Sequence, residues 1–161
     1  IYSRLGHTTL DIAPITLDEL VRETLFQLGP ELKERKAEIE IVAPLPCVLG
    51  HRTTLQQVFT NLISNGTKFV GKGTIPKVRI ASETNKQTAR IAIADNGIGI
   101  ASEDQPRIFR VFERLHSIDE YPGTGVGLAI VRKGLERMGG RISLESEVGK
   151  GSVFTLELPV A

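Results

Sequence analysis

The residues best suited to chemistry in this sequence are an acid and two glycines, in the stretch Asp95-Asn-Gly-Ile-Gly-Ile100. Residues 88–95 before them carry alternating small or apolar side chains in a strand-like pattern. Such a strand would deliver the carboxylate to the floor of a pocket, where it needs donors such as the exocyclic amine of adenine. Gly97 and Gly99 allow the backbone to turn and to approach a ligand closely. A plain strand ending in an Asp-Asn-Gly turn fits equally well, so this stretch alone leaves both interpretations open.

A second polar group follows one face of a predicted helix. Asn61, Asn65 and Lys68 recur at spacings of four and three, so their side chains share that face. Amide oxygens suit Mg²⁺, which prefers oxygen donors, keeps waters and is often shared with substrate phosphates. In this interpretation Asn65 binds the metal, Asn61 orients metal-bound water and Lys68 offsets phosphate charge. The alternatives are a hydrogen-bonded core asparagine and a solvated lysine.

A glycine run, Gly123-Thr-Gly-Val-Gly127, leads directly into a predicted helix, where free backbone N–H groups favour a phosphate. A dinucleotide-binding motif is excluded, because no strand precedes the run and Leu128 stands where a third glycine is needed. A P-loop is excluded because no Gly-Lys-Ser/Thr follows. Residues 116–122 lack periodicity and predict a mobile loop, and Phe109 and Phe112 beside it fit either core aromatics or the anchors of a lid.

The scaffold around these residues is predicted to mix helices and strands. Helices are expected at 17–35, with Gly29-Pro30 breaking or kinking the helix into a bend, from a Thr53-x-x-Gln56 capping box to residue 69, at 128–138, and as a short piece at 108–114. Strands are expected at 11–16, 37–42, within 44–50, and at 77–83, 88–95, 141–146 and 152–158. This mixture indicates an α+β domain with a mixed sheet and helices packed on one face.

Composition sets limits on function. The 161 residues, 40% hydrophobic and 24% charged, are ordinary for one globular domain, and the net charge of +1 gives no reason to expect nucleic acid or a membrane surface as a partner. The single cysteine excludes an internal disulfide and fits a reducing compartment, and no apolar run is long enough to cross a bilayer. Three scattered histidines lack the spacing of a zinc site. We expect a cytoplasmic domain without direct membrane contact, cut from a longer protein.

Four motifs in order carry a resemblance to a known family: Asn61-Leu-Ile-Ser-Asn-Gly-Thr-Lys-Phe69, Asp95 to Ile100, Phe109-Arg-Val-Phe-Glu-Arg114, and Gly123 to Leu128. Together they resemble the catalytic, ATP-binding domain of two-component sensor histidine kinases, which share an ATPase superfamily with gyrase, Hsp90 and MutL. The sequence of residues 112–125 looks most like that of kinases of the phytochrome type.

The resemblance implies a two-layer α/β sandwich, a mixed, mostly antiparallel sheet with three helices on one face, known as the Bergerat-type ATP-binding fold. It implies that residues 11–161 form this domain and that residues 1–10 are the end of a dimerisation helix and its linker. By the matched positions, Asn65 would hold Mg²⁺, and Asn61, Lys68 and Arg114 would act at the phosphates. The implied ATP-binding set is Asn61, Asn65, Lys68, Phe69, Asp95, Gly97, Gly99, Ile100, Gly123, Thr124, Gly125, Val126, Gly127 and Leu128.

Two departures from the family pattern concern the helix that carries Asn65. Gly66 replaces the usual alanine, which would loosen the helix at the metal ligand by about 1 kcal/mol. His51 stands where an acidic residue is common, so the helix is expected to rely on Thr53 for its cap.

The implied reaction is transfer of the γ-phosphate of ATP to a histidine on a dimerisation helix, then relay to a response-regulator receiver domain. No histidine here has the sequence context of the phosphoacceptor, so it would lie elsewhere in a homodimeric parent protein. Two alternatives stay open: an ATPase of the gyrase or Hsp90 sort, which carries a glutamate where this chain has Asn61, and a docking module without kinase activity.

Overall fold

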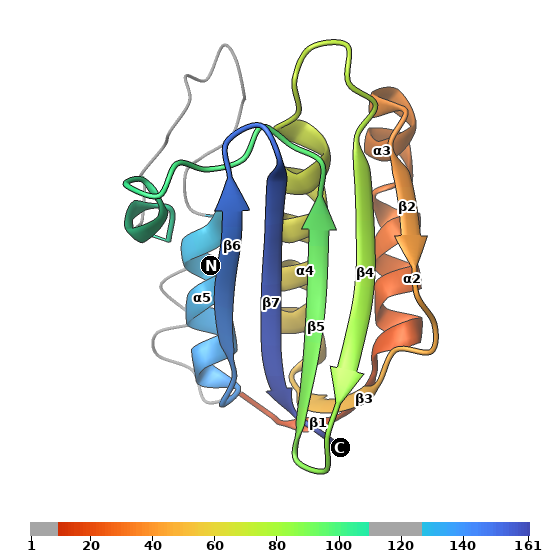
Figure 1. Cartoon of the computed structure of the whole chain (residues 1–161). Helices are drawn as coiled ribbons and strands as arrows, with labels where there is room; N and C mark the ends of the chain where they lie inside the picture. Colours follow the sequence, from red (N-terminus) through yellow and green to blue (C-terminus); the bar gives the residue numbers. More distant parts are fainter. Residues whose placement is uncertain (1–9, 110–126) are drawn as a thin grey trace.

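In the computed structural model, which describes residues 10–109 and 127–161, a five-stranded sheet forms one layer (Figure 1). Only β2 and β4 pair in parallel, and the other three neighbouring pairs are antiparallel. The strands in spatial order are β2 (Glu38–Ile41), β4 (Lys77–Thr84), β5 (Thr88–Asp95), β7 (Gly151–Pro159) and β6 (Arg141–Glu147). The prediction of a mixed, mostly antiparallel sheet is confirmed.

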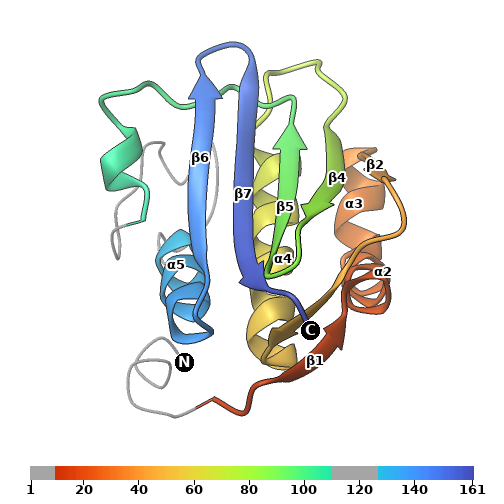
Figure 2. The same cartoon turned by 60° about the horizontal axis from the view of Figure 1, so that its bottom comes forward.

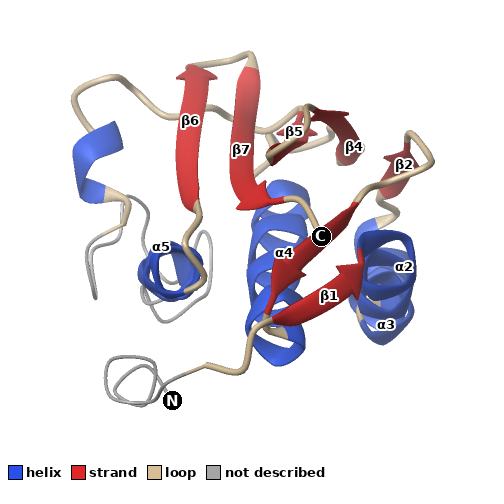
Figure 3. Ribbon diagram, turned by 90° about the horizontal axis from the view of Figure 1, so that it is seen from below, coloured by secondary structure: helices blue, strands red, loops and turns tan. Residues whose placement is uncertain are grey.

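The helices form the second layer, on one face of this sheet (Figures 1 and 2). In Figure 1, α4 lies behind the central strands, α2 and α3 lie at the β2–β4 side, and α5 lies beside β6. The helices are α2 (Leu17–Gln27), α3 (Gly29–Arg35), α4 (Arg52–Lys68) and α5 (Gly127–Arg137), with a 3₁₀ turn, η1 (Gln105–Arg107). A small antiparallel pair, β1 (Ala13–Thr16) and β3 (Cys47–Gly50), lies at the lower end of the fold in Figure 1. It comes to the front when the fold is seen from below (Figure 3).

The break predicted at Gly29-Pro30 within residues 17–35 is confirmed, and it separates two helices rather than bending one. These are α2 and α3, separated at Leu28, and Pro30 lies in the first turn of α3. Proline has no N–H to continue the preceding helix but fits the first turn of a new one, so the predicted three helices become four.

The two layers meet in an apolar core. Alternate residues of β4 and β5 and one face of each helix are buried there, as the hydrophobic periodicity predicts. The largest fully buried side chains are Leu17, Leu20, Leu55, Phe59, Leu62, Ile63, Ile80, Ile91, Ile93, Leu135, Leu156 and Leu158. Within the two described ranges no helix is long and apolar enough to span a membrane.

The start of α4 differs from the prediction. Its N-cap is His51, whose Nδ1 accepts a hydrogen bond from the Thr54 backbone N–H at 3.3 Å. The backbone N–H of His51 also donates to Met138 Sδ at 3.2 Å, which ties this end of the helix to the residue after α5. The Thr53–Gln56 capping box is therefore wrong: Thr53 already lies inside the helix, whose first residue is Arg52.

We predict that His51→Ala lowers the free energy of unfolding by about 1 kcal/mol, because an orphan N–H of α4 loses its acceptor. Chemical denaturation measures the change. Thr53→Ala is the matched control and is expected to change the stability less. A larger loss for Thr53→Ala than for His51→Ala would contradict the assigned cap.

Candidate functional site

The inner face of the sheet ends in a polar row at one end of the core. Asp95 at the end of β5 pairs with Ser152 of β7, which in turn pairs with Ser146 of β6. Directly paired residues point to the same face of a sheet, so the three polar side chains follow one another on the helix-covered side. The acid of the central motif therefore has two serines as neighbours.

Burial governs the chemistry of Asp95. Its Oδ1 accepts hydrogen bonds from the backbone N–H groups of Gly97 at 2.8 Å and Ser152 at 3.2 Å. Loss of solvent raises the pKa of Asp95 from 3.8 to about 6, and these two donors hold it below a still higher value. Both hydrogen bonds go to Oδ1, so Oδ2 is the oxygen that is available to a ligand.

The loop after Asp95 is built around close backbone contacts. A Cβ on Gly97 would lie 2.4 Å from the Phe69 carbonyl oxygen and 2.8 Å from Asp95 Oδ1. Ile98 N donates to the same carbonyl oxygen at 2.9 Å, which fixes the loop to the end of α4. Asn96 faces the other way, where its side chain bonds to the backbone of Lys77 at 2.7 Å and Ile75 at 2.9 Å.

The turn between β6 and β7 supports this loop from the other side. Gly99 has φ +78°, and a Cβ there would lie 2.1 Å from the Glu147 carbonyl oxygen, so only glycine fits. Ile98 O accepts from Gly149 N at 2.8 Å, and Ile100 N donates to Ser146 Oγ at 2.8 Å. The predicted residues Gly97, Gly99 and Ile100 thus lie in one rigid loop beside Asp95.

Sequence reasoning missed three residues of this region: Gln105, Ser146 and Ser152. Gln105 Nε2 donates to the carbonyl oxygens of Ile100 at 3.1 Å and Ser146 at 3.3 Å, so η1 also holds the loop. The two serines lie in strand-like stretches, and their link to Asp95 depends on strand register.

Helix α4 brings the predicted amides to the same end of the fold. Asn61 Nδ2 donates to the Gln57 carbonyl oxygen at 2.9 Å, which fixes the amide so that Oδ1 is its free acceptor. A Cβ on Gly127, the first residue of α5, would lie 2.9 Å from that Oδ1. Asn61, which is predicted to act at the phosphates, therefore contacts Gly127, the last glycine of the predicted phosphate-binding run. Leu128 follows Gly127 in α5 and packs partly against the core.

Asn65 and Gly66 lie in the turn of α4 that faces Asp95. A Cβ on Gly66 would lie 3.2 Å from Asp95 Cβ and 3.1 Å from Val78 Cγ2, so α4 approaches the sheet closely there. The expected loosening at Gly66 is opposed from α3. Arg35 Nη1 donates to Ser64 O at 3.1 Å and to Thr67 Oγ1 at 2.9 Å, on either side of Asn65 and Gly66.

Lys68 and Phe69 close the helix at this end. Lys68 Nζ lies 5.0 Å from the centroid of the Phe69 ring, a cation–π contact. Phe69 N donates to the Asn65 carbonyl oxygen at 3.1 Å as α4 ends. The Phe69 carbonyl oxygen contacts the loop after Asp95, so α4 ends beside that loop, and the roles of Lys68 and Phe69 at a nucleotide stay predictions.

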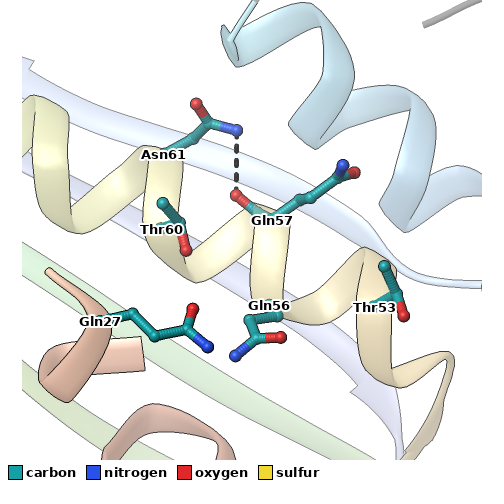
Figure 4. A pocket seen from close by; sticks show the side chains of 6 residues that line it. All are labelled: Gln27, Thr53, Gln56, Gln57, Thr60 and Asn61. Carbon is teal, nitrogen blue, oxygen red and sulfur yellow. Dashed lines mark hydrogen bonds between the residues drawn. The ribbon is translucent and has the colours of Figure 1, made fainter. Parts of the chain in front are cut away.

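A neutral pocket of about 230 Å³ adjoins Asn61 on the outer side of α4 (Figure 4). Its walls carry amides and hydroxyls from Gln27, Thr53, Gln56, Gln57, Thr60 and Asn61. Within the described part of the chain, Gln56 Nε2 is buried without a hydrogen-bond partner. A neutral acceptor or a water suits this pocket, whereas a phosphate would find no cation among its walls.

Several predicted residues lie outside the described ranges: Arg114, Phe112, Gly123, Thr124, Gly125 and Val126, together with the end of the short helix at 108–114, the loop at 116–122 and the segment 1–9. Phe109, at the edge of the described part, packs edge-on against Phe154 of β7, with ring centroids 6.4 Å apart. It therefore contacts the core.

The fold and site together define a class. A buried acid at the end of a mixed sheet, glycine contacts beside it and an amide-bearing helix opposite are the features of an ATP-binding α/β sandwich. Residues 50–161 match the family described as "Histidine kinase-, DNA gyrase B-, and HSP90-like ATPase", and the chain belongs to that family.

The curated relatives of this chain include sensor histidine kinases. It is 44% identical over 159 residues to the phytochrome-like protein Cph1 of Synechocystis sp., covering 99% of this chain and 21% of that protein. It is 36% identical to the sensor protein GacS of Pseudomonas syringae pv. syringae, covering 97% of this chain and 18% of that protein. The chain thus spans about a fifth of the length of these curated relatives.

Solved structures of histidine kinases are similar to this chain in fold. Full-length ShkA in complex with AMPPNP superposes with a TM-score of 0.82 at 31% identity, covering 99% of this chain and 34% of that one. The catalytic domain of histidine kinase ThkA superposes with a TM-score of 0.78 at 28% identity, covering 94% of this chain and 99% of that one. The family match and these similarities to histidine kinases and their catalytic domains confirm the resemblance drawn from the four motifs.

We predict that Asp95→Asn makes the domain more stable but a poorer nucleotide binder. Because burial raises the pKa of Asp95 to about 6, folding favours the protonated acid, and the free energy of unfolding falls as pH rises from 3.8 to about 6. Asparagine does not ionise, so the variant does not lose stability in this pH range. Above pH 6 its free energy of unfolding should exceed that of the wild type by about 1–3 kcal/mol, and the difference should vanish toward pH 4. Chemical denaturation above pH 6 and near pH 4 measures this difference.

The same variant should bind ATP at least about tenfold more weakly by calorimetry, because an amide N–H would face the adenine amine. Unchanged ATP affinity would remove Asp95 from the adenine site.

We predict that Gly97→Ala weakens ATP binding by more than about tenfold, because its Cβ would displace the Phe69 carbonyl and the Asp95 carboxylate together. Gly29→Ala is the matched control, since no atom lies within 4 Å of its Cβ position. Calorimetry of both variants tests this, and equal affinities would show that the loop tolerates a side chain.

Proposed function

We propose that this domain binds Mg²⁺-ATP and presents the γ-phosphate to a histidine on a helix of its parent protein. The supporting observation is the buried carboxylate of Asp95. Two backbone N–H groups hold its Oδ1, and Oδ2 remains for a ligand. Such an acceptor suits the exocyclic amine of adenine. The phosphates would then extend toward Asn61, Asn65, Lys68 and the start of α5.

The residues on α4 fit magnesium in their chemistry. Asn65 and Asn61 offer hard amide oxygens, and the fixed amide of Asn61 presents Oδ1 rather than its N–H₂ group. Among the described residues no cluster of three or more His, Cys, Asp or Glu side chains forms a protein-only metal cage. Magnesium would therefore share its coordination with phosphate oxygens, and it would supply charge neutralisation there.

Asn61 favours a kinase over an ATP-hydrolysing machine. Hydrolysis needs a base near the attacking water, and an amide has no basic lone pair to accept the proton. Asn61 is also fixed to the helix backbone through its Nδ2, which makes it suited to holding water or metal in place. Phosphoryl transfer depends mainly on such positioning and on charge neutralisation.

The partners follow as proposals from the same assignment. The domain would dock on dimerisation helices that carry the phosphoacceptor histidine in a homodimeric parent protein, and a response-regulator receiver domain would accept the phosphate next. The similarity to Cph1 supports a parent of the phytochrome type. The net charge of +1 gives no attraction to nucleic acid, and we propose a cytoplasmic location.

The decisive experiment mixes this domain with ATP, Mg²⁺ and the histidine-bearing helical hairpin of the parent protein. We predict phosphohistidine on the hairpin, detected by radiolabel and mass spectrometry. Asn65→Ala should lower the yield more than about tenfold, whereas Asn85→Ala in the β4–β5 turn serves as the control. Absence of phosphohistidine with intact ATP binding would leave only a docking role.

A further inference from the structure

Ser146, the outer member of the polar row Asp95–Ser152–Ser146, makes three hydrogen-bond contacts through its Oγ. Its Oγ accepts from Ile100 N at 2.8 Å, lies 3.0 Å from the Gly151 carbonyl oxygen and lies 2.8 Å from Ser152 Oγ. Ser152 is 6% exposed, and its backbone N–H donates to Asp95 Oδ1. The strands that carry Ser146, Ser152 and Asp95 lie side by side as β6, β7 and β5 (Figure 1).

Only one arrangement of protons satisfies all three contacts of Ser146. A serine hydroxyl has one proton and two lone pairs, and the Ile100 N–H group occupies one lone pair. The Gly151 carbonyl oxygen can only accept, so it takes the Ser146 proton. The second lone pair of Ser146 must then accept the proton of Ser152. The Ser152 hydroxyl proton is thereby directed to Ser146, so Ser152 Oγ can serve any other group only as an acceptor.

We propose that Ser146 is a positioning residue for base selection: it fixes the direction of the Ser152 hydroxyl so that Asp95 and Ser152 present two adjacent acceptors. This inference rests on the proposed function. Two adjacent acceptors match a group that donates two hydrogens, directly or through a water, as the 6-amino group of adenine does. A 6-oxo purine would place a carbonyl oxygen against them, which leaves buried acceptors without donors.

A second set of contacts gives Ser146 the rigidity that this role needs. Its own carbonyl oxygen accepts from Gln105 Nε2, which also donates to the Ile100 carbonyl oxygen. Ser146 and Ile100 are thus joined twice, once through the Ser146 hydroxyl and once through Gln105. Loss of the hydroxyl would free Ser152 to turn and donate to a 6-oxo group, while Gln105 would keep the loop in place.

The test compares ATP with inosine triphosphate, which differs by a 6-oxo group in place of the 6-amino group. Calorimetry gives the ratio of the two dissociation constants for the wild type, Ser146→Ala, Ser146→Thr, Ser152→Ala and the double alanine variant. We expect Ser146→Ala to reduce the preference for ATP about tenfold, and Ser146→Thr, which keeps a hydroxyl, to retain it. The double variant should lose no more preference than Ser152→Ala alone, because Ser146 acts through Ser152.

Hydrogen exchange without nucleotide gives a second readout, since the Ile100 amide should exchange faster in Ser146→Ala than in Ser146→Thr. Equal weakening of both nucleotides with an unchanged ratio would show a merely structural role and overturn the proposal. Additive losses in the double variant would also overturn it. A wild-type domain that binds neither nucleotide would instead overturn the proposed function, so the two failures are distinct.

Discussion

The structure depends on the burial of one carboxylate at the end of a sheet. Taking Asp95 out of water disfavours its ionised form, and two backbone N–H groups from different strands and loops reduce that cost. These donors reach Oδ1 only because residue 97 has no side chain and because β7 lies directly beside β5. The strand order and the glycine at position 97 are therefore both needed to bring hydrogen-bond donors to this carboxylate.

Helix α4 is held at both ends while it presents its polar face. His51 caps its first turn, and Arg35 of α3 bonds to its last turn around Asn65. Arg35 also adds a positive charge near the C-terminal end of the helix, where the helix dipole favours a cation. This support lets the helix carry a glycine next to the predicted metal ligand, and that glycine lets the helix approach Asp95 closely.

The predictions from sequence succeeded where a pattern extended over many residues. Strands β4 to β7 and helix α5 agree with their predicted ranges within one or two residues, and the structure brings Gly97 and Gly66 against Asp95 and Gly127 against Asn61. The prediction of the α4 cap was wrong because the Thr53-x-x-Gln56 pattern resembles a capping box, whereas the cap is His51, two residues earlier, which accepts through an imidazole nitrogen. Ser146 and Ser152 were missed because their connection to Asp95 follows from strand register, which no local pattern records. The phosphate role of the glycines before Gly127 stays a prediction, because they lie outside the described residues.

The position of β7 has a consequence for how the domain matures. This strand is the last to leave the ribosome among those of the sheet, yet it lies between β5 and β6 and supplies the Ser152 N–H group to Asp95. Until the β6–β7 hairpin adds to the open edge of β5, the carboxylate lacks one of its donors and the loop at Gly99 lacks its support. The Asp95 pocket therefore cannot be complete in a nascent chain until β7, which follows the helices α2 to α5 in the sequence, has been synthesised and has paired with β5.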